Sequence, residues 1–171
     1  GFVAGPGGLM ARILGIPLVI HEQNRIPGTT NKLLAKISNQ VLEAFPNSFN
    51  KGVGAKCTGN PLRKQFQILG TEKEALEGRN LHILILGGSQ GAKVLNEVIP
   101  DALSLLKDLE IKHQTGAAME AQVEKRYQDL GMKADANAFI QDMVSAYKWA
   151  DIIICRAGAM TVSEVAAMGL P

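Results

Sequence analysis

The sequence has little cysteine, few aromatic residues and almost no excess of charge. Its 171 residues include two cysteines, Cys57 and Cys155, and 5% aromatic side chains. Because the cysteines are far apart and outside any CxxC or His-rich spacing, they argue against a disulfide framework and a zinc site, and a reducing compartment is the default. A net charge of +2, without a run of Lys and Arg, argues against a nucleic-acid partner.

Long hydrophobic runs are also missing. No apolar run reaches the ~18 residues that a membrane-spanning helix needs, and the N-terminus has no basic segment typical of a signal peptide. The 46% hydrophobic and 20% charged residues are typical of a soluble globular protein, and 18 glycines suit an α/β fold with tight loops. The chain opens in a glycine-rich loop at 1–8. It stops at 169–171, where a helical pattern has ended and the next element is expected to be a strand. We therefore expect an interior piece of a longer protein.

Short helical and strand patterns alternate in the first part of the chain. Apolar residues recur at helical spacing over 9–14, and Gly15 is placed to end that helix. A short buried strand at 18–20 leads into the polar cluster His-Glu-Gln-Asn at 21–24, and another strand is expected over 41–45. Because function collects at the carboxyl ends of parallel strands, the cluster at 21–24 is a candidate site.

His21 and Glu22 carry the acid–base chemistry of this cluster. A histidine beside a carboxylate can transfer a proton or bind an acceptor sugar. The same two residues also suit a hydrogen-bonded pair at the end of a strand, so both interpretations stay open.

The turn Gly59-Asn60-Pro61-Leu62-Arg63 ends in a cation. Arg63 can neutralise a phosphate or remain a solvated surface charge. Between 64 and 80 the chain is polar and has no strand signal. We therefore place a domain boundary near Arg63, with a first unit at 1–63 and a second at 64–171.

Strand and helix patterns alternate regularly from Leu81 onward, which predicts parallel βαβ units with right-handed crossovers. The predicted elements are strands at 81–86, 111–114, 138–140 and 151–155 and helices at 90–107, 118–130, 142–149 and 160–168. Pro100 lies inside the 90–107 helix, where it predicts a kink or a first-turn position. The inward face of that helix is expected to contain Leu95, Val98, Ile99, Ala102 and Leu106.

A glycine-rich loop, Gly87-Gly88-Ser89-Gln90-Gly91, joins the strand at 81–86 to a helix. Glycines and the N–H groups of a helix start can approach and bind a phosphate. The loop is not a Walker A motif, departs from GxGxxG, and has no acidic residue well placed for an adenosine ribose. It therefore indicates either a diphosphate cradle or a βα turn with glycines for packing.

The strand at 151–155 also runs into a turn of small residues and a helix. Ala159 to Thr161 offer backbone donors at the helix start, and Glu164, one turn later, can accept both hydroxyls of a ribose or cap the helix. Ile140, at the end of the predicted strand 138–140, has a backbone that can read a base edge and a side chain suited to the core. His82 and His113 lie in strand patterns and are interpreted as structural.

Five motifs occur together in one order along the chain, and each of them alone is weak. They are Gly-Pro-Gly-Gly at 5–8, His-Glu-Gln-Asn at 21–24, Gly-Asn-Pro-Leu-Arg at 59–63, Gly-Gly-Ser-Gln-Gly-Ala at 87–92 and Arg-Ala-Gly-Ala-Met-Thr-Val-Ser-Glu at 156–164. As a set they resemble the MurG family of peptidoglycan N-acetylglucosaminyltransferases, over essentially the whole chain.

The resemblance implies an α/β fold of two Rossmann-like domains facing across a cleft, the GT-B glycosyltransferase architecture, both incomplete here. The first domain would hold acceptor and membrane contacts, and the second most of the UDP-sugar site. The family moves N-acetylglucosamine from UDP-N-acetylglucosamine to the 4-hydroxyl of undecaprenyl-diphospho-N-acetylmuramoyl-pentapeptide, with inversion and without a metal or cofactor. The alternative is a nucleotide-binding Rossmann module without transferase activity, or an oxidoreductase.

The resemblance also implies a place in the cell. The family works peripherally on the cytoplasmic side of the bacterial inner membrane, in cell wall synthesis and hence in cell shape and division. Its partners would be UDP-N-acetylglucosamine, the undecaprenyl-linked muramoyl-pentapeptide and the membrane surface, with no nucleic acid.

Site residues follow from the motifs that match the family. The diphosphate loop would be Gly87, Gly88, Gln90 and Gly91, with Ile140 binding uracil through its backbone. The residues implied for UDP-N-acetylglucosamine are Asn24, Arg63, Ser89, Ile140, Ala159, Met160, Thr161, Val162, Ser163 and Glu164. His21 and Glu22 are the candidates for acceptor binding or proton transfer. The family's N-terminal glycine loop with its histidine is absent, so we expect the main base outside this chain.

We expect the isolated 171-residue chain to transfer no sugar, because it lacks roughly half of the ~300 residues of two complete Rossmann-like domains. Incubation with labelled UDP-N-acetylglucosamine and the lipid acceptor checks this expectation. Measurable sugar transfer by the isolated chain would contradict it.

Overall fold

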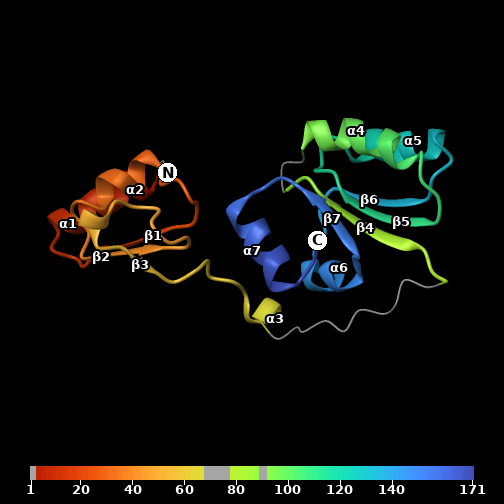
Figure 1. Ribbon diagram of the computed structural model, residues 1–171. Helices are drawn as coiled ribbons and strands as arrows, with labels where there is room; N and C mark the ends of the chain where they lie inside the picture. The colour runs from red at the N-terminus through yellow and green to blue at the C-terminus, as the bar shows by residue number, and fades with distance from the viewer. Residues whose placement is uncertain (1–2, 68–77, 89–91) are drawn as a thin grey trace. The chain divides into compact units, whose positions relative to one another are not determined.

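A computed structural model describes residues 3–67, 78–88 and 92–171. Two compact units, Gly1–Pro61 and Leu62–Pro171, make up the chain, so Arg63 lies at the start of the second unit. Both units contain a fully parallel sheet with helices (Figure 1), which confirms the predicted α/β fold class. Within the described ranges, no helix is both long and apolar enough to cross a membrane. The facing of two domains across a cleft stays a prediction.

The first unit has a three-stranded parallel sheet in the order β1-β2-β3. Its elements are α1 (Ala4–Ile13), β1 (Val19–Glu22), α2 (Thr29–Leu34), β2 (Gln40–Glu43), a 3₁₀ turn (Lys51–Val53) and β3 (Lys56–Cys57). Gly15 follows α1 with a φ of 71°, as expected of a residue that ends a helix.

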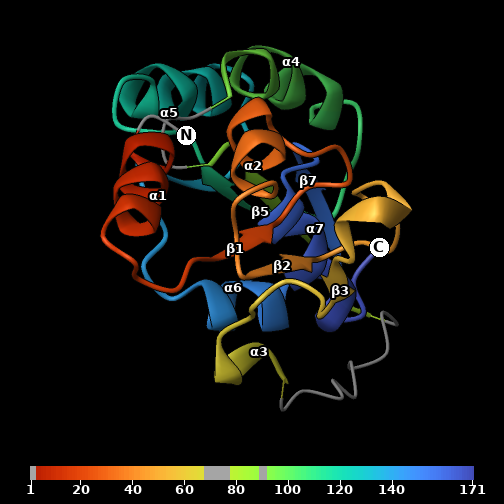
Figure 2. The ribbon, with the colours of Figure 1, turned by 90° about the vertical axis from the view of Figure 1, so that its left-hand side faces the viewer.

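The two helices of the first unit lie side by side (Figures 1 and 2). Gly8 permits this approach, because a Cβ at Gly8 would lie 2.8 Å from a methyl carbon of Leu34. Leu34 in turn packs with Ile20, Val41 and Phe49 in a small core beneath the helices. Packing of this core holds β1, and with it the polar cluster at 21–24, in place.

The second unit has a four-stranded parallel sheet in the order β6-β5-β4-β7. Helices α4 and α5 lie on one face of this sheet, and α6 and α7 on the other (Figure 1). The elements are α3 (Lys64–Gln67), β4 (Leu81–Leu86), α4 (Lys93–Leu103), β5 (Leu109–Gln114), α5 (Glu120–Asp129), β6 (Ala134–Asn137), α6 (Met143–Trp149), β7 (Ile152–Cys155) and α7 (Ala159–Ala167).

The strand order contains a switch point between β4 and β7. From β4 the chain adds β5 and then β6 on one side, and it returns to place β7 on the other side of β4. The connections that follow β4 and β7 therefore leave in opposite directions. Ligands of doubly wound sheets bind outside the carboxyl ends of the strands at such a point.

The central strand β4 is buried on both faces, as expected of a parallel strand between two helix layers. Ile83 and Ile85 pack beneath α4 and α5, whereas Leu84 and Leu86 pack against α6 and α7. Each of these four side chains is at most 6% exposed. The glycine loop that follows therefore starts from a rigid base.

One sequence expectation about this unit is wrong, and another holds only in part. The strand predicted at 138–140 is β6 at Ala134–Asn137, so Ile140 lies in the following loop rather than at a strand end. The Ala-Asp-Ala-Asn segment has weak strand propensity, but it pairs in parallel with β5, and such pairing overrides propensity. The predicted apolar segment instead leaves Phe139 58% exposed.

The inward face of α4 also differs from its apolar pattern. Leu95 and Ile99 pack against the core as expected, and Asn96, Pro100 and Leu103 are buried. Val98, expected inward, is 55% exposed, and Leu106, which is equally exposed, lies beyond the end of the helix. Pro100 lies well beyond the first turn of the helix, so the first-turn alternative is wrong. The polar Asn96 is accommodated inside because it has hydrogen-bond partners there.

Asn96 belongs to a buried network with His113 and Tyr127. The Asn96 amide nitrogen donates to the Thr115 carbonyl at 2.8 Å, so its oxygen faces Nε2 of His113 at 3.1 Å. His113 therefore carries its hydrogen on Nε2, and Nδ1 accepts from the Tyr127 hydroxyl at 3.0 Å. Burial lowers the pKa of His113 to about 4.

This network predicts that acid destabilises the second unit. A histidine whose pKa is lowered from 6.5 to about 4 in the folded state loses about 3 kcal/mol of stability as the pH falls through that window. Trp149, the chain's single tryptophan, reports unfolding of this unit by fluorescence in urea. We expect His113→Gln to flatten the fall below pH 6.5, and His82→Gln to retain it. Equal pH profiles in the two variants would contradict the assignment.

Candidate functional site

The carboxyl ends of the strands in the second unit meet at one edge of the sheet. Leu86, the last residue of β4, is in register with Gln114 of β5 and with Cys155 of β7. Beyond the strand, the Gly87 N–H donates to the Gln114 carbonyl at 3.2 Å. The start of the glycine loop therefore lies next to the Arg156 turn, although 68 residues separate Gly88 from Arg156 in the sequence.

Gly88 and Arg156 are in close contact at this edge. Gly88 has a φ of 81°, which favours glycine. A Cβ at this position would also lie 3.2 Å from Nη2 of Arg156. Glycine at 88 therefore leaves room for the guanidinium of Arg156, an exposed residue. Ser89, Gln90 and Gly91 lie outside the described residues.

Helix α7 begins at the same edge, directly after Arg156. Its N-cap is Gly158, in extended conformation, which has no side chain to cap the first-turn N–H groups. The predicted donor segment Ala159 to Ser163 forms the start of this helix. A helix N-terminus with its partial positive charge therefore lies at the switch point.

Glu164 lies in α7, and its carboxylate accepts a hydrogen bond from the neighbouring helix α6. The hydroxyl of Tyr147 in α6 donates to Oε2 of Glu164 at 3.0 Å. The alternative prediction is that Glu164 caps the start of α7. Its carboxylate instead accepts from a side chain of another helix, and the start of α7 has no side-chain cap. The ribose role of Glu164 stays a prediction.

Ile140 lies in the loop after β6, at the same edge. Its side chain is half-buried against the core below α6 and α7, and its N–H approaches Oε1 of Gln114 at 3.4 Å. Gln114 therefore contacts both the glycine loop, through its carbonyl, and the segment expected to read the base, through its side chain. The structure places these two segments together on β5.

In the first unit, two predicted motifs come together. Nε2 of His21 donates to the Gly59 carbonyl at 3.0 Å, and the Asn60 amide donates to the Gln23 carbonyl at 3.2 Å. These bonds tie the turn at 59–61 to the strand-end cluster. Because Nε2 of His21 carries the hydrogen, Nδ1 is the nitrogen with a lone pair that can accept a proton.

Glu22 is buried, with 2% exposure, and its carboxylate accepts four hydrogen bonds. Oε1 accepts from the backbone N–H and the side-chain amide of Asn24 at 2.9 and 3.1 Å, and Oε2 accepts from Gly28 N–H at 3.1 Å and Asn31 Nδ2 at 2.9 Å. Burial raises the pKa of Glu22, but these hydrogen bonds outweigh it and hold the pKa below its usual value. The geometry therefore suits positioning of Asn24 better than proton transfer.

Four residues with a place in these arrangements had no predicted role. Arg156 is the first residue of the 156–164 motif. A cation directly after a strand is the sequence signal that could have pointed to it. Asn31, Gln114 and Tyr147 gave no signal, because their contacts come from segments distant in the sequence.

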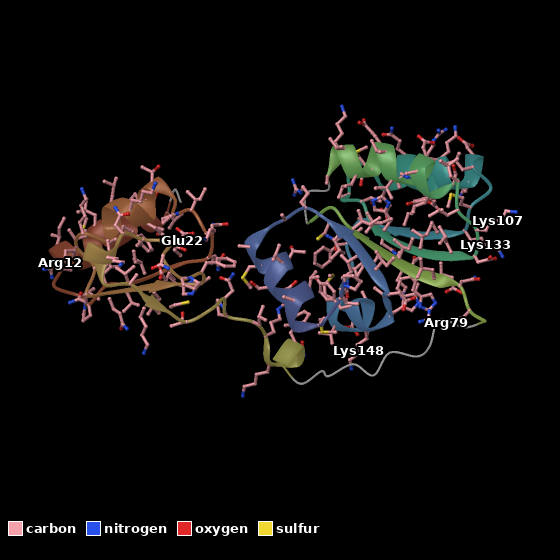
Figure 3. The ribbon with its side chains drawn as sticks, viewed as in Figure 1. Arg12, Glu22, Arg79, Lys107, Lys133 and Lys148 are labelled. Carbon is pink, nitrogen blue, oxygen red and sulfur yellow. The ribbon has the colours of Figure 1, made fainter. Side chains whose placement is uncertain are left out.

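Three other cations of the second unit lie at the opposite end of its sheet. Arg79, Lys107 and Lys133 precede β4, β5 and β6, and Figure 3 shows them at the amino ends of the strands. Arg79 pairs with Asp151 at 2.8 Å, and this ion pair joins the segment before β4 to the segment before β7. Across the described ranges, no cluster of three His, Cys, Asp or Glu side chains is arranged to hold a metal ion.

The second unit has the parallel sheet and the switch point of Rossmann-like nucleotide-binding proteins. The chain belongs to glycosyltransferase family 28. The model of the family's C-terminal domain matches residues 82–171, and that of its N-terminal domain matches residues 1–43.

The relatives carry one name, UDP-N-acetylglucosamine–N-acetylmuramyl-(pentapeptide) pyrophosphoryl-undecaprenol N-acetylglucosamine transferase. The protein of this name from Methylococcus capsulatus is 58% identical over 100% of this chain and 48% of its own length, and that from Pseudomonas syringae pv. tomato is 49% identical over 100% and 49%. The crystal structure of Acinetobacter baumannii MurG is similar with a TM-score of 0.76 and 45% identity, over 97% of this chain and 47% of that one. The chain thus spans about half the length of these relatives.

We expect Glu22→Gln to loosen the loop that carries Asn24. Glutamine replaces one acceptor oxygen by an amide donor, so two of the four donors lose their partner, at a cost of about 2–3 kcal/mol. Amide hydrogen exchange measured by NMR should become faster at Asn24 and Gly28.

Glu43→Gln is the matched control, because Glu43 is also buried at a strand end and accepts from the N–H groups of Asn47 and Phe49. It should leave exchange at Asn24 unchanged. Protection of Asn24 that is equal in wild type and Glu22→Gln would show that the carboxylate does not hold the loop.

Proposed function

We propose that the protein containing this chain transfers N-acetylglucosamine from UDP-N-acetylglucosamine to the 4-hydroxyl of undecaprenyl-diphospho-N-acetylmuramoyl-pentapeptide. Membership of glycosyltransferase family 28 and the shared name of the relatives support this assignment. The second unit binds the UDP-sugar, and the first unit carries acceptor contacts. The product is the lipid-linked disaccharide used in peptidoglycan synthesis.

The observation that carries the proposal is the contact between Gly88 and Arg156 at the switch point. The start of the glycine loop, a guanidinium and the start of α7 lie at one edge of the sheet, and a nucleoside diphosphate needs this set of groups. The same edge holds Ile140 and Glu164 for the uracil and the ribose. Ser89, with Gln90 and Gly91, completes the diphosphate loop in this proposal.

The reaction is a direct displacement with inversion. The acceptor hydroxyl attacks the anomeric carbon, the bond from that carbon to the diphosphate oxygen breaks, and the electron pair leaves with UDP. Negative charge therefore grows on the diphosphate, where Arg63, Arg156 and the helix N-termini stabilise it. Backbone donors and guanidinium groups of this kind are positioned before the reaction and do not need to reorganise.

The first unit serves the acceptor and the sugar. His21, with a lone pair on Nδ1, is the group of this chain suited to accept a proton or a hydrogen bond from the acceptor. Glu22 holds both nitrogens of Asn24, and this leaves the Asn24 amide oxygen to accept from the donor sugar.

A membrane-facing surface completes the proposal. Helix α1 and its C-cap Leu14 expose Leu9, Met10, Ile13 and Leu14, each more than 50% accessible, next to the cation Arg12 (Figure 3). Apolar side chains beside basic ones are typical of surfaces that bind the interface of an anionic membrane. We place this helix at the cytoplasmic face of the bacterial inner membrane, where the lipid-linked acceptor is anchored.

Calorimetric titration of the complete gene product that contains this chain tests the proposal. We expect binding of UDP-N-acetylglucosamine and no preference for NAD. Arg63→Ala and Glu164→Ala should each weaken UDP-N-acetylglucosamine binding by roughly 10- to 100-fold, because each removes a charge-assisted hydrogen bond worth about 1.5–3 kcal/mol.

Arg126→Ala is the matched control, because Arg126 pairs with Asp101 on the helix layer of α4 and α5. It should leave the affinity unchanged. Preference for NAD would overturn the proposed function, and so would wild-type affinity for UDP-N-acetylglucosamine in Arg63→Ala and Glu164→Ala as well as in Arg126→Ala. Either result would favour a nucleotide-binding module or an oxidoreductase.

A further inference from the structure

Glu164 has a buried partner that the proposed function does not use. Tyr147 is 1% exposed, and its hydroxyl lies 3.0 Å from Oε2 of Glu164. The two residues come from α6 and α7, which cover the same face of the sheet (Figure 1). A phenol in this position can fix the direction of a carboxylate that would otherwise rotate freely.

The phenol is the hydrogen donor in this contact. Burial and the neighbouring Glu164 both raise the pKa of Tyr147 far above its usual value, so the hydroxyl keeps its hydrogen at any physiological pH. Oε2 of Glu164 therefore accepts this hydrogen, and Oε1 is the oxygen that remains for a ligand. A carboxylate held by one oxygen presents the other in a defined direction.

The ring of Tyr147 is itself fixed. It packs edge to face against Phe66 with 5.6 Å between ring centres and an interplanar angle of 76°, within a core that also contains Leu84 and Met168. Phe66 lies in α3, the short helix that begins directly after Arg63. The hydroxyl is thus an anchored point, and Glu164 adjusts to it rather than the reverse.

We propose that Tyr147 is a positioning residue for ribose recognition, which orients the Glu164 carboxylate toward the 2′- and 3′-hydroxyls of a uridine nucleotide. The inference rests on the proposed function, because that function gives Glu164 its ribose. Orientation before binding reduces the side-chain ordering that the ligand would otherwise have to bring about. Tyr147 therefore determines how strongly the site prefers a ribonucleotide to a 2′-deoxyribonucleotide.

The test compares UDP with 2′-deoxy-UDP in calorimetric titrations of the complete gene product. Wild type should prefer UDP by roughly tenfold or more, since a ribose hydroxyl donates to a charged acceptor. Tyr147→Phe keeps the ring against Phe66 and should reduce this preference by about three- to tenfold, mainly by weakening UDP. Replacing Tyr147 with 4-aminophenylalanine restores a donor and should recover part of the preference.

Tyr127→Phe is the matched control, because it removes the other buried phenol hydroxyl of this chain, from the network of His113. It should leave the ratio of the two affinities at the wild-type value. If Tyr147→Phe behaves in the same way, or lowers both affinities equally, the positioning role is refuted while the proposed function stands.

A double-mutant cycle keeps the inference testable at the level of coupling. Combined with Glu164→Gln, Tyr147→Phe should change the preference for UDP by less than it does alone, since the two groups act as one unit. Additive effects would overturn the inference. Wild-type protein that binds neither UDP nor 2′-deoxy-UDP would instead refute the proposed function, and this outcome is distinct from all the others.

Discussion

The parallel register of β4 with β5 and β7 is the constraint on which the candidate site depends. Because all strands run the same way, their carboxyl ends finish at one edge, and the segments predicted to bind the ligand at 87–88, 140 and 159–164 each follow one of those ends. The burial of β4 on both faces makes this register costly to shift, since a slip of one residue would move its apolar side chains to the wrong helix layer. The sheet thus sets where Gly88 and Arg156 meet.

The carboxylates of Glu22 and Glu164 have different surroundings. The four hydrogen bonds that Glu22 accepts all come from its own loop and the helix that follows. Glu164 accepts from the hydroxyl of Tyr147 in another helix. A buried carboxylate without donors would be too costly to keep ionised, and the four donors around Glu22 meet this need. Glu164, which is only half-buried, keeps one oxygen outside its bond with Tyr147, and its contact with a ribose stays a prediction.

Sequence patterns predicted the elements with strong local signals. The apolar run before the glycine loop, the alternation of strands and helices, and Gly15 at the end of α1 all reflect local rules of burial and backbone conformation. The predictions failed where a distant partner outweighs the local pattern. β6 forms from Ala-Asp-Ala-Asn because β5 pairs with it, and α4 turns Asn96 inward because His113 and Thr115 bond to it.

The sequence by itself determined the α/β class, the order of the motifs and the family that they resemble, because these depend on residue types and their spacing along the chain. Only the tertiary structure decided which side chains meet. The contact of Gly88 with Arg156, and the bond from Tyr147 to Glu164, join segments that are far apart or on different helices. Such contacts depend on strand order and helix packing, and no local pattern encodes them.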